Sequence, residues 1–271
     1  MRRFLFACLG LFAAATALVA ADSRPATPEE LALFKAAMMN SSQDTEHWAY
    51  TETTTVRTNQ EKEKPGRETV VRFDPSKPYA EQYTPLKIDG KPPSEKQLKQ
   101  YRKNGEERGK KRARRAAEGA PGKREPQLMI NDSKARLDLE HPRVVKEGPE
   151  RITFEVPLVS ESQELPVEKF QILAEVDPQA RQIKRAHFRI REAFRMKLIA
   201  KIKSGEAVVD FTVVDPEFGP VITSMVGDFG ASFMFIPVRA TFTNTRMEWK
   251  RVKAFDERFN VKLDPLQFPG F

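Results

Sequence analysis

The chain has 271 residues with a net charge of +8, 39% hydrophobic residues, 31% charged residues and one cysteine. This length suits one large domain or two small ones, and the composition is polar without being that of a chain disordered throughout. Beyond the N-terminal segment, no apolar run approaches the roughly 18 residues of a bilayer-spanning helix, which excludes an integral membrane protein of the helical kind.

The N-terminus has the pattern of an export signal. Arg2 and Arg3 precede an uncharged apolar stretch over 4–19, and small residues follow just before Asp22. This arrangement predicts a signal peptide over 1–21 that is cleaved on export, with an N-terminal anchor helix as the alternative.

Cleavage at this point has consequences for the chemistry and the location of the protein. It removes Cys8, so the mature chain has no cysteine for a disulfide, a thiolate nucleophile or a metal site. A cysteine-free exported chain suits a bacterial periplasm. We therefore expect a periplasmic protein, with outer-membrane association left open, in which residues 22–271 form a single domain.

Two helix starts stand out in the first half of the chain. The sequence Thr27-Pro28-Glu29-Glu30 combines a capping threonine, a proline at the first helical position and an acidic first turn, which predicts an amphipathic helix over 28–40. The sequence Ser94-Glu95-Lys96-Gln97 is a capping-box pattern and predicts a second helix over 94–103.

Strand patterns fill most of the remaining chain. Segments rich in β-branched and aromatic residues predict strands over 48–56, 69–73 and 82–88, and an almost unbroken β signal runs over 152–249. Short turns between the segments indicate antiparallel neighbours. The predicted fold class is α+β, with a large curved antiparallel sheet covered by short helices.

Local patterns in this second half also predict where strands and turns lie. Alternation of apolar and basic residues over 194–203 predicts one strand, followed by a hairpin turn at Ser204-Gly205. The glycines at both ends of 227–230 favour a turn between strands there.

The basic charge is concentrated in one segment. Residues 94–117 hold ten lysines and arginines against three glutamates, and a cluster of glycine and proline follows at 119–122. Because almost no apolar face continues after Gly105, residues 104–126 are predicted to be a basic, solvated or disordered insertion.

Three interpretations of this insertion remain. It could contact an anionic membrane or lipopolysaccharide surface, or it could be a mobile, solubilising loop. Nucleic-acid binding ranks last, and no nucleic-acid partner is expected, because Tyr101 is the only aromatic residue over 94–126. The residues expected to contact an anionic surface are Arg108, Lys110, Lys111, Arg112, Arg114 and Arg115.

No pattern in the sequence predicts catalytic chemistry. His47, His141 and His187 lie far apart without metal-ligand spacing, and no glycine-rich phosphate loop is present. Ser232 follows Gly230-Ala231 but lacks the second glycine of a nucleophile elbow. We therefore expect no catalytic residue, no metal, no cofactor and no enzymatic activity.

The apolar residues of the second half need a cover. Fourteen of the sixteen phenylalanines after the signal lie at or beyond Phe154, and an antiparallel sheet usually buries one apolar face. Two short helices do not easily fill the hollow of a curved sheet, so either an apolar cavity or a fully packed sandwich or barrel core results. The residues expected to line the cavity or core are Phe188, Ile190, Phe194, Met196, Leu198, Phe211, Phe233 and Phe235.

The order of these elements resembles the LolA/LolB-type lipoprotein-carrier superfamily, which includes outer-membrane lipoprotein-sorting proteins. The shared features are an export signal, an N-terminal amphipathic helix and a long antiparallel sheet interrupted by a helical segment. Residues 170–177 and 183–190 resemble the paired strands of that family, and the resemblance covers most of 27–255. It implies a half-barrel closed by helices around an acyl-chain cavity. The basic insertion over 104–126 departs from the family, and no individual binding residue can be carried over.

These patterns favour an exported, non-enzymatic protein that binds a hydrophobic ligand, such as the acyl chains of a lipid or lipoprotein. The alternative is an envelope interaction or stress-sensor module with a packed core and a protein partner. A hydrolase would need a compact polar cluster in a cleft, which the sequence does not indicate.

Overall fold

The computed structural model describes residues 23–42, 47–59, 66–117, 135–160, 165–196, 200–234 and 236–258. The predicted signal peptide over 1–21, the predicted lining residues Leu198 and Phe235, and the part of the predicted insertion after residue 117 lie outside these ranges.

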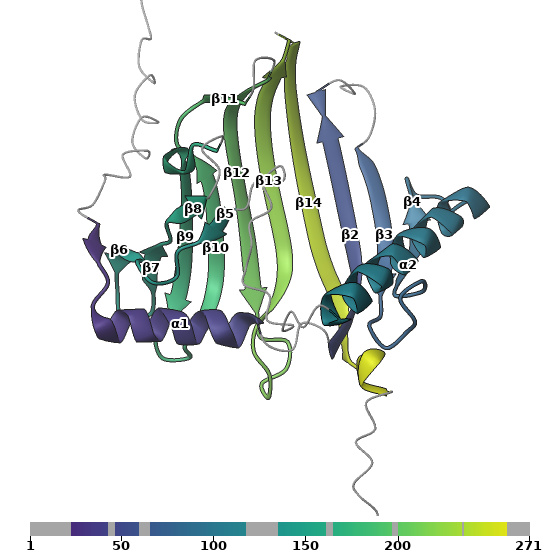
Figure 1. Cartoon of the computed structure of the whole chain (residues 1–271), viewed down its shortest axis with the longest axis horizontal. Coiled ribbons are helices and arrows are strands. Elements are labelled where there is room, and N and C mark those ends of the chain that lie inside the picture. Colours follow the sequence, from purple (N-terminus) through teal and green to yellow (C-terminus); the bar gives the residue numbers. More distant parts are fainter. Residues whose placement is uncertain are drawn as a thin grey trace, which may run out of the picture.

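A twelve-stranded antiparallel sheet forms the body of the molecule (Figure 1). Its edges are β1 and β4, so the sheet does not close, and the predicted α+β fold class with a large antiparallel sheet is confirmed. Across the sheet, the strands are β1 (Arg24–Pro25), β6 (Arg143–Glu147), β7 (Ile152–Glu155), β9 (Phe170–Asp177), β10 (Gln182–Ile190), β12 (Ala200–Thr212), β13 (Val221–Phe233), β14 (Ile236–Arg251), β2 (Trp48–Thr58), β3 (Arg67–Phe73) and β4 (Tyr83–Ile88). In addition, β11 (Phe194–Met196) pairs with β12, and β5 (Ala135–Leu137) pairs with β8 (Leu158–Ser160) in a separate small sheet.

Two helices lie on the same face of the sheet, near its opposite ends. Helix α1 (Pro28–Ser42) packs mainly against β10, and helix α2 (Glu95–Ala117) packs mainly against β4 (Figure 1). We call the face that carries the helices the inner face. The central strands β12, β13, β14 and β2 lie between the two helices.

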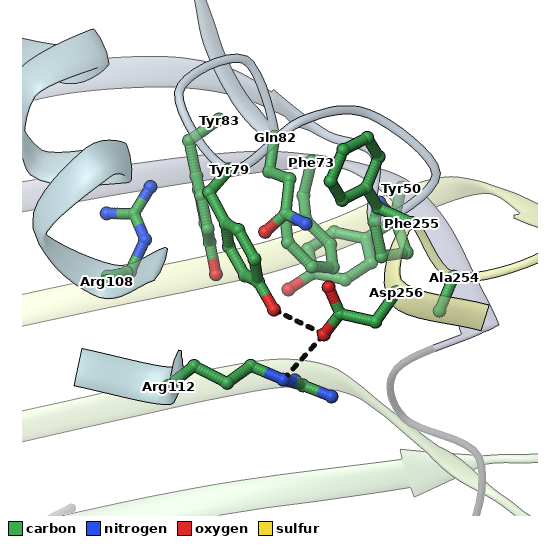
Figure 2. A pocket seen from close by; sticks show the side chains of 11 residues that line it. Tyr50, Phe73, Tyr79, Gln82, Tyr83, Arg108, Arg112, Ala254, Phe255 and Asp256 are labelled. Atoms are coloured by element: carbon green, nitrogen blue, oxygen red, sulfur yellow. Dashed lines mark hydrogen bonds and ion pairs between the residues drawn. The ribbon is translucent and has the colours of Figure 1, made fainter. Parts of the chain in front are cut away.

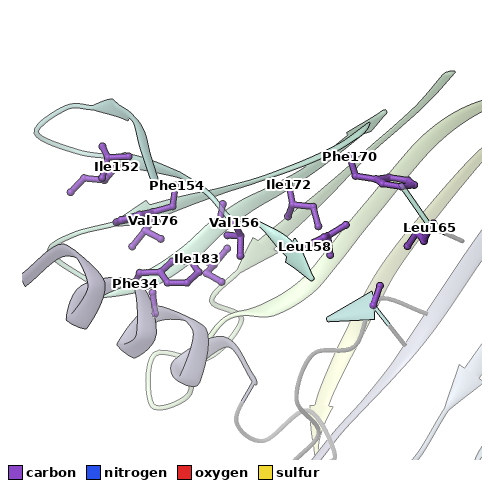
Figure 3. Packing of buried hydrophobic residues seen from close by; sticks show 14 of the residues in the cluster. Phe34, Ile152, Phe154, Val156, Leu158, Leu165, Phe170, Ile172, Val176 and Ile183 are labelled. Atoms are coloured by element: carbon purple, nitrogen blue, oxygen red, sulfur yellow. The ribbon is translucent and has the colours of Figure 1, made fainter. Parts of the chain in front are cut away.

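The main hydrophobic core lies under α1. Phe34 has no exposed surface and packs on Phe154, with a ring-centroid distance of 5.2 Å (Figure 3). Along β9, every second residue is buried, as the two-residue period of a strand requires. The buried cluster consists of Phe34, Ala37, Ala135, Val144, Ile152, Phe154, Val156, Leu158, Leu165, Phe170, Ile172, Ala174, Val176, Ile183 and Phe194. The hollow is therefore filled by side chains at this end of the sheet.

Strand pairing places one continuous row of residues on the inner face of the central strands. Phe188 opposes Ala207, Ala207 opposes Gly227, Gly227 opposes Phe242, and Phe242 opposes Val56. Directly opposed residues of antiparallel strands point to the same side of the sheet. This row therefore crosses β10, β12, β13, β14 and β2 on one face.

The prediction of a single strand over 194–203 is wrong. Phe194 pairs with Ile202 and Met196 pairs with Ala200, so the segment folds back as the β11–β12 hairpin. The prediction of a turn at Ser204-Gly205 is also wrong, because both residues lie inside β12. Pairing across the hairpin keeps the apolar residues on one face, so the alternation by itself does not distinguish one long strand from two short ones.

The predicted turn over 227–230 is likewise wrong, because this segment lies inside β13. The two-residue period continues through it as Met225, Gly227, Phe229 and Ala231 on the inner face. At Gly227, glycine stands where the alternation would have an apolar side chain. The sequence over 227–230 therefore resembles a turn.

The predicted insertion over 104–126 is not disordered over 104–117, which continue α2, although the residues over 106–114 are exposed except for the half-buried Gly109. Gly105 is buried, and a Cβ atom there would overlap the carbonyl oxygen of Tyr79 and lie 2.8 Å from Ala80 Cα. Gly109 lies directly over the Tyr79 ring. Glycine thus lets α2 approach the loop between β3 and β4 closely, which substitutes for an apolar helix face.

Candidate functional site

The central part of the inner face carries a half-buried apolar surface, which we call the central floor. It lies on β12, β13, β14 and β2, between the strands on which the two helices mainly pack (Figure 1). Its residues are partly exposed except for two buried glycines, in contrast to the closed core under α1. The central floor consists of Gly205, Ala207, Gly227, Phe229, Ala231, Ala240, Phe242 and Val56.

Aromatic rings run from the core onto the central floor. Phe170 in the core lies 5.6 Å from Phe188, Phe188 lies 6.4 Å from Phe229, and Phe229 lies 6.0 Å from Phe242, measured between ring centroids. The rings of Phe229 and Phe242 are nearly parallel, at 5°. The floor therefore offers a continuous apolar surface to anything that lies across the strands.

Two glycines make room for these rings. A Cβ atom on Gly205 would lie 2.8 Å from Phe229 Cδ1, and a Cβ atom on Gly227 would overlap the Phe242 ring. Each ring therefore lies low over a neighbouring strand. Glycine inside a strand weakens it, and it commonly marks a place where another group approaches the backbone closely. Here the groups that approach are the ring of Phe229 and the side chain of Ile190 over Gly205, and the ring of Phe242 over Gly227.

The opposite face of the same strands is polar. Arg185 Nε lies 2.7 Å from Asp210 Oδ1, and Arg239 forms an ion pair with Asp228. The hydrogen bond from Arg239 lowers the pKa of Asp228, which keeps this carboxylate ionised. Around the floor, the inner face is therefore mainly apolar and the outer face mainly polar, so the floor is the side suited to an apolar ligand.

The predicted lining residues fall into three groups. Phe194 belongs to the buried core, whereas Phe233, at the end of β13, is 50% exposed. The remaining described residues are half-buried against the core: Phe188, Ile190, Met196 and Phe211. Of the predicted set, Phe188 borders the central floor at Phe229, and Ile190 borders it at Gly205.

The residues that sequence reasoning missed are Phe229, Phe242, Val56 and the two glycines of the floor. The alternation within β13 was available as a signal, but the glycines hid it. Val56 belongs to β2, more than a hundred residues from β13 in the sequence, and only the pairing of β2 with β14 brings it to the floor.

A polar band separates the floor from the region under α2. On the inner face, Asn244 donates to Thr54 over 2.8 Å, and Arg246 lies 3.1 Å from the Glu52 carboxylate. Arg246 also covers the ring of Tyr50 at 4.9 Å. An apolar ligand would lose favourable contacts at this band, which therefore limits the floor on the side of α2.

A second concave feature, a pocket of about 240 Å³, lies under α2 (Figure 2). The Tyr79 hydroxyl donates to Asp256 over 2.5 Å, and Arg112 Nε pairs with the same carboxylate at 2.9 Å. Arg108 lies over the Tyr83 ring at 4.3 Å. The lining residues are Tyr50, Phe73, Pro75, Tyr79, Gln82, Tyr83, Arg108, Arg112, Ala254, Phe255 and Asp256.

The electrostatics of this pocket favour a structural role. Burial raises the pKa of Tyr50 well above its usual range, with Arg246 opposing, so the phenol remains neutral and is not a base. Asp256 is engaged by both Tyr79 and Arg112 (Figure 2). These contacts join α2 to the end of the sheet and leave no unengaged acid–base pair in the pocket.

The basic residues of α2 divide between two directions. Arg108 and Arg112 turn toward the pocket, although both were expected to contact an anionic surface. Lys110, Lys111 and Arg114 are exposed, and the side chain of Arg115 lies outside the described residues. Contact of α2 with an anionic surface remains a prediction.

The three histidines lie apart, each beside one carboxylate. His47, His141 and His187 lie 2.5, 2.9 and 2.7 Å from Glu257, Asp138 and Glu206, respectively. Within the described ranges, no cluster of three or more histidine, cysteine or acidic residues forms that could hold a metal ion.

Comparison with known proteins gives one structural similarity. No protein-family model and no curated protein matches the sequence. A crystal structure of a LolA superfamily protein from Nitrosomonas europaea is similar at 8% sequence identity, with 84% of this chain and 96% of that chain covered and a TM-score of 0.34. The likeness between the two structures is weak.

Neither α1 nor α2 could cross a bilayer. Among the described helices, none is both long enough and apolar enough to do so. The longer one, α2, carries basic residues along most of its length.

Proposed function

We propose that the protein is a non-enzymatic, exported carrier that binds a hydrophobic ligand, such as the acyl chains of a lipid or lipoprotein, on the central floor. The observation that supports this most directly is the row of half-buried rings from Phe188 to Phe242 between the two helices. These apolar rings lie on the inner face of the sheet, whereas the outer face is mainly polar. Acyl chains that bind on the rings are removed from water.

The free energy of such binding depends on the apolar area that the ligand removes from water. Each methylene removed from water contributes about 0.8 kcal/mol before the cost of ordering the ligand. The floor has no described charged group among its members, so this gain is not offset by desolvating a charge. Specificity would then depend on chain length and shape more than on hydrogen bonds.

A pair of substitutions tests whether the inner face binds the ligand. Val56→Asp places a carboxylate on the floor, where Val56 is 38% exposed and opposes Phe242. Thr243→Asp places the same charge on the outer face of the adjacent strand, where Thr243 is exposed. We expect Val56→Asp to weaken binding of a fluorescent fatty acid about tenfold or more, and Thr243→Asp to leave it unchanged.

Mass spectrometry of the extracted protein provides an independent measurement. Co-purified lipid that is present in the parent protein and in Thr243→Asp, but depleted in Val56→Asp, supports binding on the floor. Repeated absence of lipid, together with equal fatty-acid affinities for both variants, contradicts the proposal and favours the sensor module with a protein partner. Circular dichroism and melting temperatures of both variants establish that the fold is retained.

A further inference from the structure

The turn between β13 and β14 exposes large apolar side chains that the floor does not use. Phe233, Met234 and Ile236 are 50%, 61% and 59% exposed. They are close in sequence and lie at the end of the sheet farthest from α1, where β13 and β14 meet (Figure 1). Single exposed apolar residues are common on soluble proteins, but a contiguous group at one protruding end is not.

The backbone conformation at Met234 is unusual for a residue with a long apolar side chain. Met234 has a φ of 45°, in the left-handed region that glycine or asparagine adopts at lower cost. Neither the backbone nor burial therefore explains a methionine at this position.

The neighbouring β11–β12 hairpin carries positive charge on the outer face at this end of the sheet. Arg195 pairs with Lys201, Lys201 with Ser232, and Ser232 with Pro237, which places all four on the outer face. Arg195 and Lys201 are exposed, and no carboxylate among the described residues lies within ion-pair distance of either. Apolar residues on one side and unneutralised cations on the other form an amphipathic end.

We propose that this end of the sheet inserts shallowly into the interface of an anionic lipid bilayer. Phe233, Met234 and Ile236 would enter the boundary between headgroups and acyl chains, while Arg195 and Lys201 would remain at the level of the anionic headgroups. The charge favours an anionic bilayer over a second copy of this chain, because two copies meeting at this end would bring like charges together. Insertion does not depend on ligand binding by the floor, and each can fail without the other.

A site-specific label tests the insertion directly. The full chain is produced with Cys8→Ser so that, whether or not residues 1–21 are cleaved, a cysteine introduced at Ile236 or at Val226 is the single target for an environment-sensitive dye. Val226 is the matched control, because it is 47% exposed on the outer face of β13, away from the turn. With vesicles of phosphatidylethanolamine and phosphatidylglycerol, we expect a blue shift of the dye at position 236 and none at position 226. Equal responses at both positions, or none at 236, would overturn the proposal.

Unlabelled variants separate the apolar and the electrostatic contributions. Met234→Ser combined with Ile236→Ser should weaken sedimentation with these vesicles about tenfold, whereas Val226→Ser should not. Arg195→Gln combined with Lys201→Gln should weaken it several-fold, and only for the anionic vesicles, since vesicles of phosphatidylcholine lack the opposite charge. A blue shift at position 236 that follows protein concentration without vesicles would instead identify a contact between copies, and would also overturn the proposal.

Discussion

The two helices attach to the same sheet by different physical means. Helix α1 inserts an apolar side chain, Phe34, into a closed core against Phe154. Helix α2 attaches through close approach at Gly105 and through the contact of Arg112 with Asp256. The first attachment depends on removing apolar area from water, and the second on shape and on directed polar contacts.

This difference accompanies a difference in packing beneath the two helices. Apolar side chains from α1 and the strands below it interdigitate and leave a packed core (Figure 3). Under α2, arginine side chains make polar and cation–π contacts, and a pocket of about 240 Å³ remains. The central floor lies between the strands that carry α1 and α2. The rings of Phe229 and Phe242 there remain partly exposed.

The largest expected effect tests the apolar attachment. Phe34→Ala should lower the free energy of unfolding by about 3 to 5 kcal/mol, because a fully buried ring is removed and a cavity remains. Met39→Ala is the control on the same helix, since Met39 is 60% exposed, and should cost less than about 1 kcal/mol. Urea titration followed by circular dichroism measures both, and similar costs for the two variants would contradict the assignment of the core.

A smaller effect of unusual sign tests the close approach of α2. Alanine normally stabilises a helix relative to glycine by up to about 1 kcal/mol. Gly105→Ala should instead destabilise the protein by about 2 kcal/mol, because its Cβ atom meets the backbone of Tyr79 and Ala80. Glu106→Ala, on the exposed side of the helix, should have an effect near zero. A gain in stability for Gly105→Ala would show that α2 is not held in this way.

The smallest expected effect distinguishes the two helix starts by pH. Thr27 and Glu30 form a capping box on α1, and Ser94 and Gln97 form one on α2. The hydrogen bond from Arg24 lowers the pKa of Glu30 from its usual 4.5 to about 2, whereas the Gln97 amide does not titrate. A carboxyl with a lowered pKa stabilises the folded state fully above 4.5, and the contribution is lost as the pH falls toward 2.

Acid should therefore loosen the start of α1 before the start of α2. Between pH 5 and pH 3, we expect hydrogen-exchange protection to fall first at the amides near Thr27, with Ser94 unaffected over this interval. Glu30→Gln should remove this pH dependence and cost about 1 kcal/mol at neutral pH. Equal loss of protection at both starts would mean that acid acts through another group.

The sequence was sufficient for the features that depend on local pattern. The capping sequences predicted where both helices begin, and the two-residue period predicted the sheet and its apolar face. These features are local, because hydrogen bonding within a turn and side-chain alternation within a strand involve residues that are close in sequence.

Tertiary structure decided where those faces meet and how closely. Pairing of β2 with β14 placed Val56 beside Phe242, and Gly105 and Gly109 allowed the basic helix α2 to pack closely on Tyr79. The glycines at 205 and 227 resembled turns until the rings above them were known. The composition and order of the residues thus determined which elements form and which side of each element is apolar. Long-range contacts determined which apolar surface is packed and which remains partly exposed, because burial depends on neighbours that are distant in the chain.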